Sequence, residues 1–133
     1  MYEEVAEMLD KAQETVLQLW ATNKYLARQA NFWNEDDEVS MFVFTSNVSR
    51  EETLAELRDA AAKGNFWRVH FFSESGVITP DGQTMEVLLL EVGDADSQLY
   101  GVRLFSVEHP PQILAQNAEP LESSPLAGML KNV

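Results

Sequence analysis

The first quarter of the chain constrains the fold most, because residues 2–33 contain neither glycine nor proline. Apolar or small side chains recur there at alternating spacings of four and three residues. A repeat of about 3.5 residues is typical of an α-helix that buries one face. The repeat consists of Val5, Leu9, Ala12, Val16, Leu19, Asn23, Leu26, Ala30 and Trp33. We therefore expect one long N-terminal helix that ends between residues 30 and 33.

This helix is long enough to predict contact with a second chain. At 1.5 Å per residue it would extend about 45 Å, which exceeds the usual width of a small domain. Asn23 interrupts the apolar repeat at a position where a polar residue can set the register of paired helices. The half that holds Leu19 and Leu26 is expected to pack on a sheet. We expect the rest to form a homodimer seam, made of Val5, Leu9, Ala12, Val16 and Asn23.

A compact acidic run follows the predicted helix. It consists of Glu35, Asp36, Asp37 and Glu38, directly after Asn34. Runs of like charge are usually solvated connectors, and this is one interpretation. The other is a contact surface for a basic partner, which makes these four carboxylates the candidate partner-binding residues.

Residues 39–45 predict a strand, since they are β-branched, aromatic and apolar at nearly every position. Such a strand is expected to be central and covered on both faces. Ser49 and Glu52 then form a capping box, which starts a helix at about Arg50. We expect that helix to end at Gly64, in a left-handed conformation. Because a helix connects this strand to the next one, at 66–72, the two strands are candidates for a parallel pair.

Three further strands are predicted, over residues 66–72, 84–92 and 99–107, with turn residues between them. Short turns favour antiparallel neighbours. The sequence therefore predicts an α+β fold in the order α-β-α-β-β-β, with one long and one shorter helix on a mainly antiparallel, or mixed, sheet of four or five strands. We assign residues 1–107 to this single domain.

Residues 108–133 contain four of the five prolines and are expected to form an extended or partly disordered tail. Leu121, Leu126, Met129 and Leu130 are the side chains that would anchor it to the domain.

Catalytic and metal-binding motifs are missing from the sequence. The chain has no cysteine and two histidines, His70 and His109, and it contains no zinc-hydrolase, P-loop or nucleophile-elbow motif. We expect no cofactor, no metal site and no enzymatic activity. A small enzyme that uses His70 or a carboxylate is the least favoured alternative.

Net charge restricts the partners. Twenty-two acidic and nine basic residues give a formal charge of −13, which repels nucleic acid and anionic lipid surfaces. No apolar run is long enough for a transmembrane helix, and the N-terminus does not resemble a signal peptide, so we expect a cytoplasmic protein.

These features predict a non-catalytic, acidic protein-interaction module that binds another, basic protein. Small bacterial or phage accessory proteins of the inhibitor, immunity or chaperone-like kind share this profile of size, acidity and absent catalytic motifs. The alternative is a small apolar-ligand-binding protein, with a pocket between helix and sheet lined by aromatic residues such as Phe42, Phe44, Trp67 and Phe71.

Overall fold

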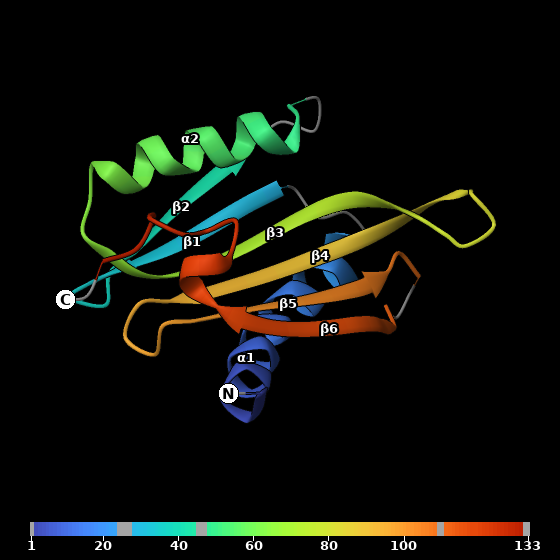
Figure 1. The fold of residues 1–133 in the computed structure, drawn as a ribbon, viewed down its shortest axis with the longest axis horizontal. Helices are drawn as coiled ribbons and strands as arrows, with labels where there is room; N and C mark the ends of the chain where they lie inside the picture. Colours follow the sequence, from blue (N-terminus) through green and yellow to red (C-terminus); the bar gives the residue numbers. More distant parts are fainter. Residues whose placement is uncertain (1, 24–27, 45–47, 109–110, 132–133) are drawn as a thin grey trace.

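The computed structural model describes residues 2–23, 28–44, 48–108 and 111–131; the side chains of residues 2, 16, 17 and 19–23 lie outside that description. Two helices pack on one six-stranded sheet, in an α+β fold (Figure 1). The sequence predicted four or five strands, so the sheet is slightly larger than expected. The elements are α1 (Tyr2–Asn23), β1 (Arg28–Asn34), β2 (Val39–Phe44), α2 (Arg50–Ala62), β3 (Phe66–Ile78), β4 (Thr84–Asp94), β5 (Leu99–Ser106), β6 (Ile113–Pro120) and a short 3₁₀ turn, η1 (Leu121–Ser123).

The strands lie in the order β2-β1-β3-β4-β5-β6, and every neighbouring pair is antiparallel. The strands at 39–44 and 66–78 are therefore not direct neighbours, because β1 lies between them. No parallel pair forms among the described strands.

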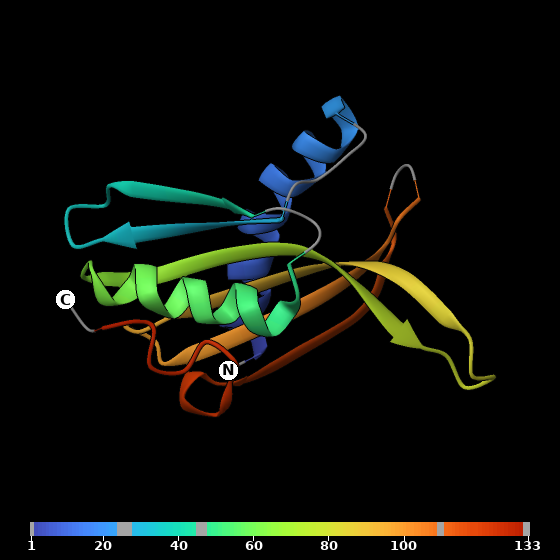
Figure 2. The ribbon, with the colours of Figure 1, turned by 90° about the horizontal axis from the view of Figure 1, so that it is seen from above.

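A core lies on each face of the sheet, which explains how one small sheet buries two helices. On one face α1 packs on β4 and β5. On the other face α2 and the C-terminal segment pack side by side, joined by a hydrogen bond from Arg58 Nη2 to the Pro125 carbonyl (2.9 Å; Figures 1 and 2). No helix within the described ranges is both long and apolar enough to cross a membrane.

The N-terminal helix ends at Asn23, seven to ten residues before the predicted end, and this corrects the sequence-based expectation. Ala30 and Trp33 lie on β1, where alternate residues Ala30 and Phe32 are fully buried. This segment forms a strand because it pairs with a strand on each side and buries these side chains in the core. Leu26 lies outside the described residues.

The first half of α1 lies close to β5 because residue 101 is a glycine. A Cβ atom at Gly101 would overlap Val5 Cγ1 and would approach Leu9 Cδ1 to 3.2 Å. Arg103 of β5 also ties this helix down, since its Nη1 donates to Asp10 Oδ1 at 2.8 Å. Figure 2 shows the second half of α1 running away from the sheet.

We expect Gly101→Val to destabilise the protein by about 1–3 kcal/mol, the usual cost of overpacking a well-filled core. The added side chain must push Val5, and with it α1, away from β5. Urea unfolding measures the change in free energy. Gly76→Val is the control, because Gly76 is an exposed strand glycine that faces only a Thr84 methyl group. Equal stability of the two variants would contradict the close approach of α1.

Helix α2 begins as predicted, and its end differs. Ser49 is the N-cap, and its Oγ accepts a hydrogen bond from the Glu52 N–H at 3.1 Å. Gly64 does not have a left-handed backbone; among the described glycines only Gly82 and Gly128 do. A Cβ at Gly64 would lie 2.6 Å from the Phe66 ring, so any other residue here would displace that ring.

Residues 111–131 pack on the sheet as a strand and a following segment, which is the extended form of the expected tail, and three of its four predicted anchors are buried. Strand β6 pairs with β5, and the chain then returns over the sheet with Leu121, Leu126 and Met129 buried. The Lys131 N–H donates to the Phe66 carbonyl at 2.8 Å. Proline is tolerated because β6 is an edge strand and Pro120 lies at its last position.

Candidate functional site

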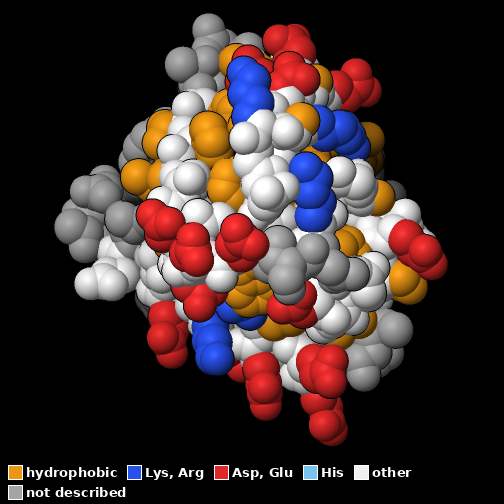
Figure 3. Space-filling model, turned by 90° about the vertical axis from the view of Figure 1, so that its left-hand side faces the viewer, with side chains coloured by type: hydrophobic (Ala, Val, Ile, Leu, Met, Phe, Trp, Pro, Cys, Tyr) orange, Lys and Arg blue, Asp and Glu red, His pale blue; other side chains and the backbone are white. Residues whose placement is uncertain are grey.

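The four predicted partner-binding carboxylates form the turn between β1 and β2. Asn34 organises this turn, because its Oδ1 accepts hydrogen bonds from the N–H groups of Asp36 and Glu38, both at 2.9 Å. Asp37 has a left-handed backbone (φ 59°) and donates its N–H to the Asn34 carbonyl. All four carboxylates are exposed. Acidic side chains are grouped at this end of the molecule, with apolar side chains exposed beside them (Figure 3).

Strand β2, which follows the turn, exposes three large apolar side chains on one face. Val39, Met41 and Val43 are 52%, 62% and 60% exposed. They share the α1 side of the sheet, but α1 packs on β4 and β5, so it does not cover β2. Three adjacent exposed apolar side chains on one strand are typical of an interaction surface rather than of isolated surface residues.

The same three residues present the free backbone edge of the sheet, since no described strand pairs with the outer side of β2. Residues of an antiparallel pair alternate between hydrogen-bonded and non-hydrogen-bonded positions. The Asn34 N–H donates to the Glu38 carbonyl at 3.1 Å, so the next pair, Trp33–Val39, is non-hydrogen-bonded. The alternation then turns the N–H and C=O groups of Val39, Met41 and Val43 away from β1, toward solvent.

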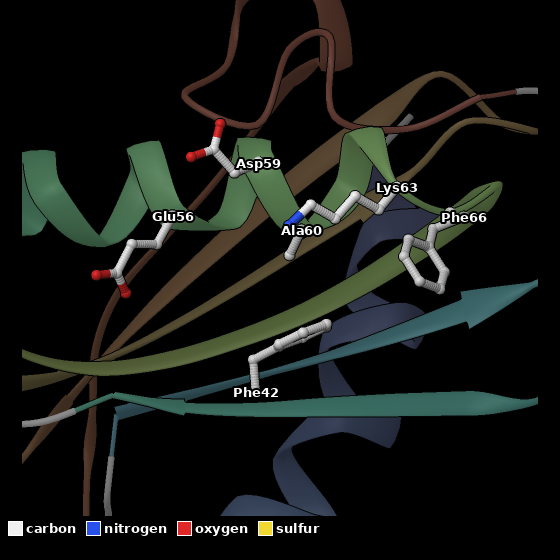
Figure 4. Close-up of a pocket in the computed structure, with 7 residues that line it drawn as sticks. Phe42, Glu56, Asp59, Ala60, Lys63 and Phe66 are labelled. Carbon is white, nitrogen blue, oxygen red and sulfur yellow. The ribbon is translucent and has the colours of Figure 1, made fainter.

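A groove lies on the other side of β2, between this strand and α2. Phe42 points from β2 toward α2, and Glu56 and Asp59 project from the helix (Figure 4). The groove has a volume of about 350 Å³ and is lined by Phe42, Glu56, Asp59, Ala60, Lys63, Gly64 and Phe66. The free edge of β2 therefore has an apolar surface on one face and a groove with two carboxylates on the other.

Two polar atoms near this surface lack partners. His70 Nε2 and Arg68 Nε are buried and make no hydrogen bond within the described structure. The nearest carboxylate oxygen to Arg68 Nε belongs to Asp94, at 3.7 Å, which is too long for a hydrogen bond. His70 packs against the Trp33 ring, with centroids 4.5 Å apart. Burial, and then the charge of Arg68, lower the pKa of His70 to about 3. His70 is thus neutral at pH 7 and has a structural environment.

We expect His70 to make stability fall as the pH decreases from 6.5 toward 3. In this range the unfolded histidine binds a proton and the folded one does not, so protonation favours the unfolded state. The slope for one proton is at most about 1.4 kcal/mol per pH unit. Urea unfolding between pH 7 and pH 4.5 measures it, with His70→Gln as the comparison. Identical pH profiles for the two proteins would contradict the lowered pKa.

A second polar cluster lies beneath the start of α2. Arg50 forms two hydrogen bonds with the fully buried Glu91 carboxylate, Nη2 to Oε1 at 2.7 Å and Nη1 to Oε2 at 3.0 Å. Tyr100 Oη donates to the same Oε1 at 2.6 Å. The Glu91 hydrogen bond raises the pKa of Arg50, and burial followed by the charge of Glu91 raises the pKa of Tyr100. Both Glu91 oxygens are engaged within the chain, so this cluster holds α2 on the sheet.

Metal-ligating side chains do not converge in the described ranges, where no group of three His, Asp or Glu residues is placed to hold an ion. The aromatic residues predicted to line a ligand pocket are divided among three environments. Phe71 is core, Phe44 and Trp67 are partly buried against it, and Phe42 lines the open groove.

Three of the five residues of the predicted dimer seam are not at a free surface in this chain. Val5, Leu9 and Ala12 are buried against β4 and β5, which leaves these side chains no area to offer a second copy. The side chains of Val16 and Asn23 lie outside the description. Among the predicted site residues whose side chains the structure describes, the four carboxylates of the turn come together at the surface and the three seam residues do not.

Sequence reasoning missed the exposed side of β2. The strand at 39–44 was expected to be central and covered on both faces, but it is an edge strand with one face open. A signal was present in residues 28–34, where buried Ala30 and Phe32 alternate with polar neighbours before an acidic turn. This pattern indicates the first strand of a hairpin.

No protein-family model matches the chain, and no curated protein or solved structure is significantly similar to it.

Proposed function

We propose that the protein is a non-catalytic protein-binding module and that its docking surface is the β2 edge. The observation that carries the proposal is the row of exposed apolar residues, Val39, Met41 and Val43, on an uncovered edge strand. Monomeric proteins usually protect such an edge with charges, proline or a covering element. A partner protein that binds at the β2 edge would explain why the chain itself leaves this edge uncovered.

The charge around the edge favours a basic partner. The acidic turn lies at one end of β2, and Glu56 and Asp59 lie across the groove. Lys63 is the single basic residue that lines this groove. Complementary charge accelerates association and selects partners, while the apolar row supplies contact area.

Capture of the partner from the cells that make this protein tests the proposal. We expect tagged wild-type protein to retain a stoichiometric partner at 0.15 M salt, and Met41→Glu/Val43→Glu to lose it. Two charges in the buried centre of an interface cost binding more than about a hundredfold. Ile78→Glu/Met85→Glu is the matched control, because it makes the same chemical change at exposed apolar residues of the β3–β4 hairpin. Equal retention by all three proteins would contradict the proposed surface.

A further inference from the structure

We propose that the partner binds by adding an extended segment to β2 as a seventh strand, with apolar side chains on one face and Lys or Arg on the other. This inference rests on the proposed protein-binding function and specifies the chemistry of the partner. The same three residues, Val39, Met41 and Val43, carry both the exposed apolar side chains and the unpaired backbone groups. Strand addition uses both, since backbone hydrogen bonds supply affinity and alternating side chains supply specificity.

The apolar half of the added strand lies on the α1 side of the sheet. Side chains of a strand alternate between the two faces, and cross-strand neighbours lie about 4.5–5.5 Å apart. Every second residue of the added segment is therefore placed beside Val39, Met41 or Val43. Apolar side chains at these positions bury the exposed row and remove it from water.

The basic half lies on the α2 side. The intervening side chains of the added strand point toward the groove that holds Phe42, Glu56 and Asp59 (Figure 4). Both carboxylates are exposed, and no ion pair within the described part of the chain involves them. Lys or Arg at these positions places its alkyl stem over Phe42 and its charge beside the carboxylates. The acidic turn adds a further negative field at the Val39 end.

A second copy of this chain fits the edge less well than a basic strand. If two β2 strands paired about a two-fold axis perpendicular to the sheet, both α2 helices would lie on the same face. The carboxylates Glu56 and Asp59 of the two copies would then face each other across the junction, in a protein whose formal net charge is already −13.

The other sheet edge is protected in a way that β2 is not. Pro111 precedes β6 and Pro120 ends it, and its two large exposed apolar residues, Ile113 and Leu114, lie where a register shift against β5 interrupts the strand. This edge offers no continuous apolar row.

A synthetic peptide tests the mode of binding without knowledge of the natural partner. The probe is a fluorescent, end-blocked Lys-Val-Lys-Val-Lys-Val-Lys peptide, and fluorescence anisotropy at 0.15 M salt measures its affinity. We expect it to bind about tenfold more tightly than the same peptide with Thr in place of Lys. Methylating the backbone nitrogens of the alternate peptide residues that face β2 should abolish binding. This change removes hydrogen-bond donors from the peptide and leaves its side chains unchanged. Amide hydrogen exchange of the wild-type protein should slow at Val39, Met41 and Val43.

Two pairs of variants separate backbone pairing from general attraction. Met41→Pro removes an outward N–H that β1 does not use, and we expect at least a tenfold loss of peptide affinity relative to Met41→Thr. Glu56→Lys/Asp59→Lys should weaken binding about tenfold, whereas Glu74→Lys/Glu86→Lys, with the same net-charge change, should leave it within about twofold. Circular dichroism establishes that each variant is folded.

The outcomes distinguish this inference from the proposed function. If Met41→Glu/Val43→Glu loses the cellular partner while exchange at β2 is unchanged on binding and N-methylation has no effect, strand addition is wrong and the docking surface stands. Protection at β6, or a wild-type dimer that Met41→Pro dissociates, overturns the basic-strand inference. If neither the partner nor the peptide depends on Met41, both proposals fail.

Discussion

Leu9→Glu is expected to detach α1 and to unfold most of the protein. Leu9 is fully buried among apolar side chains between α1 and the β4–β5 surface, and Arg103, the buried cation on this face, is already paired with Asp10. Burying an unpaired charge costs more than about 4–5 kcal/mol, which is comparable to the whole stability of a small domain. Far-UV circular dichroism and urea unfolding measure the loss.

Thr15→Glu is the matched control for this prediction. It places the same side chain on the exposed side of the same helix and should change stability by less than about 0.5 kcal/mol. A Leu9→Glu protein that kept its native spectrum and changed only from dimer to monomer would show that Leu9 belongs to the dimer seam predicted from sequence.

Arg50→Ala is expected to destabilise the protein by about 2–4 kcal/mol. A positive charge at a helix N-terminus is unfavourable, so removing it would by itself stabilise the protein slightly. The expected loss comes from Glu91, whose buried carboxylate would keep the Tyr100 hydrogen bond and lose its cation. The Arg50 side chain is 37% exposed, so water can replace part of the lost contact, and we expect less than the full cost of breaking a buried pair. Urea unfolding measures the difference.

A double-mutant cycle provides the control. Glu91→Gln keeps the shape of the side chain and an acceptor for Tyr100, so it should cost about 1–2 kcal/mol. Arg50→Ala combined with Glu91→Gln should be more stable than Arg50→Ala alone, because no buried carboxylate is then left without its cation. Additive single effects would mean that the two side chains do not interact in solution.

The elements that the sequence predicted well carry their signals locally. The N-cap of α2 depends on Ser49 and Glu52, three residues apart, and the structure confirms it. The strands predicted at 66–72, 84–92 and 99–107 from β-branched and aromatic runs correspond to β3, β4 and β5, although β3 continues six residues further, through the expected turn. The α+β class follows from these elements and is also confirmed.

Strand β1 shows where local signals fail. Ala30 and Trp33 continue the repeat of α1, and the same segment also alternates with period two at Ala30 and Phe32. Seven residues are too few to decide between the two periods. The decision comes from β2 and β3, which pair with both edges of this segment and bury Phe32 completely.

The candidate site divides in the same way. Its acidic turn is readable in the sequence, because four consecutive carboxylates cannot be buried without partners and Asn34 is a turn residue. The open edge is not readable: Val39, Met41 and Val43 have the composition of a buried strand. Whether such a strand is covered depends on where α1 lies and on which strand occupies the end of the sheet. Those are contacts between segments remote in sequence, and only the tertiary arrangement decides them.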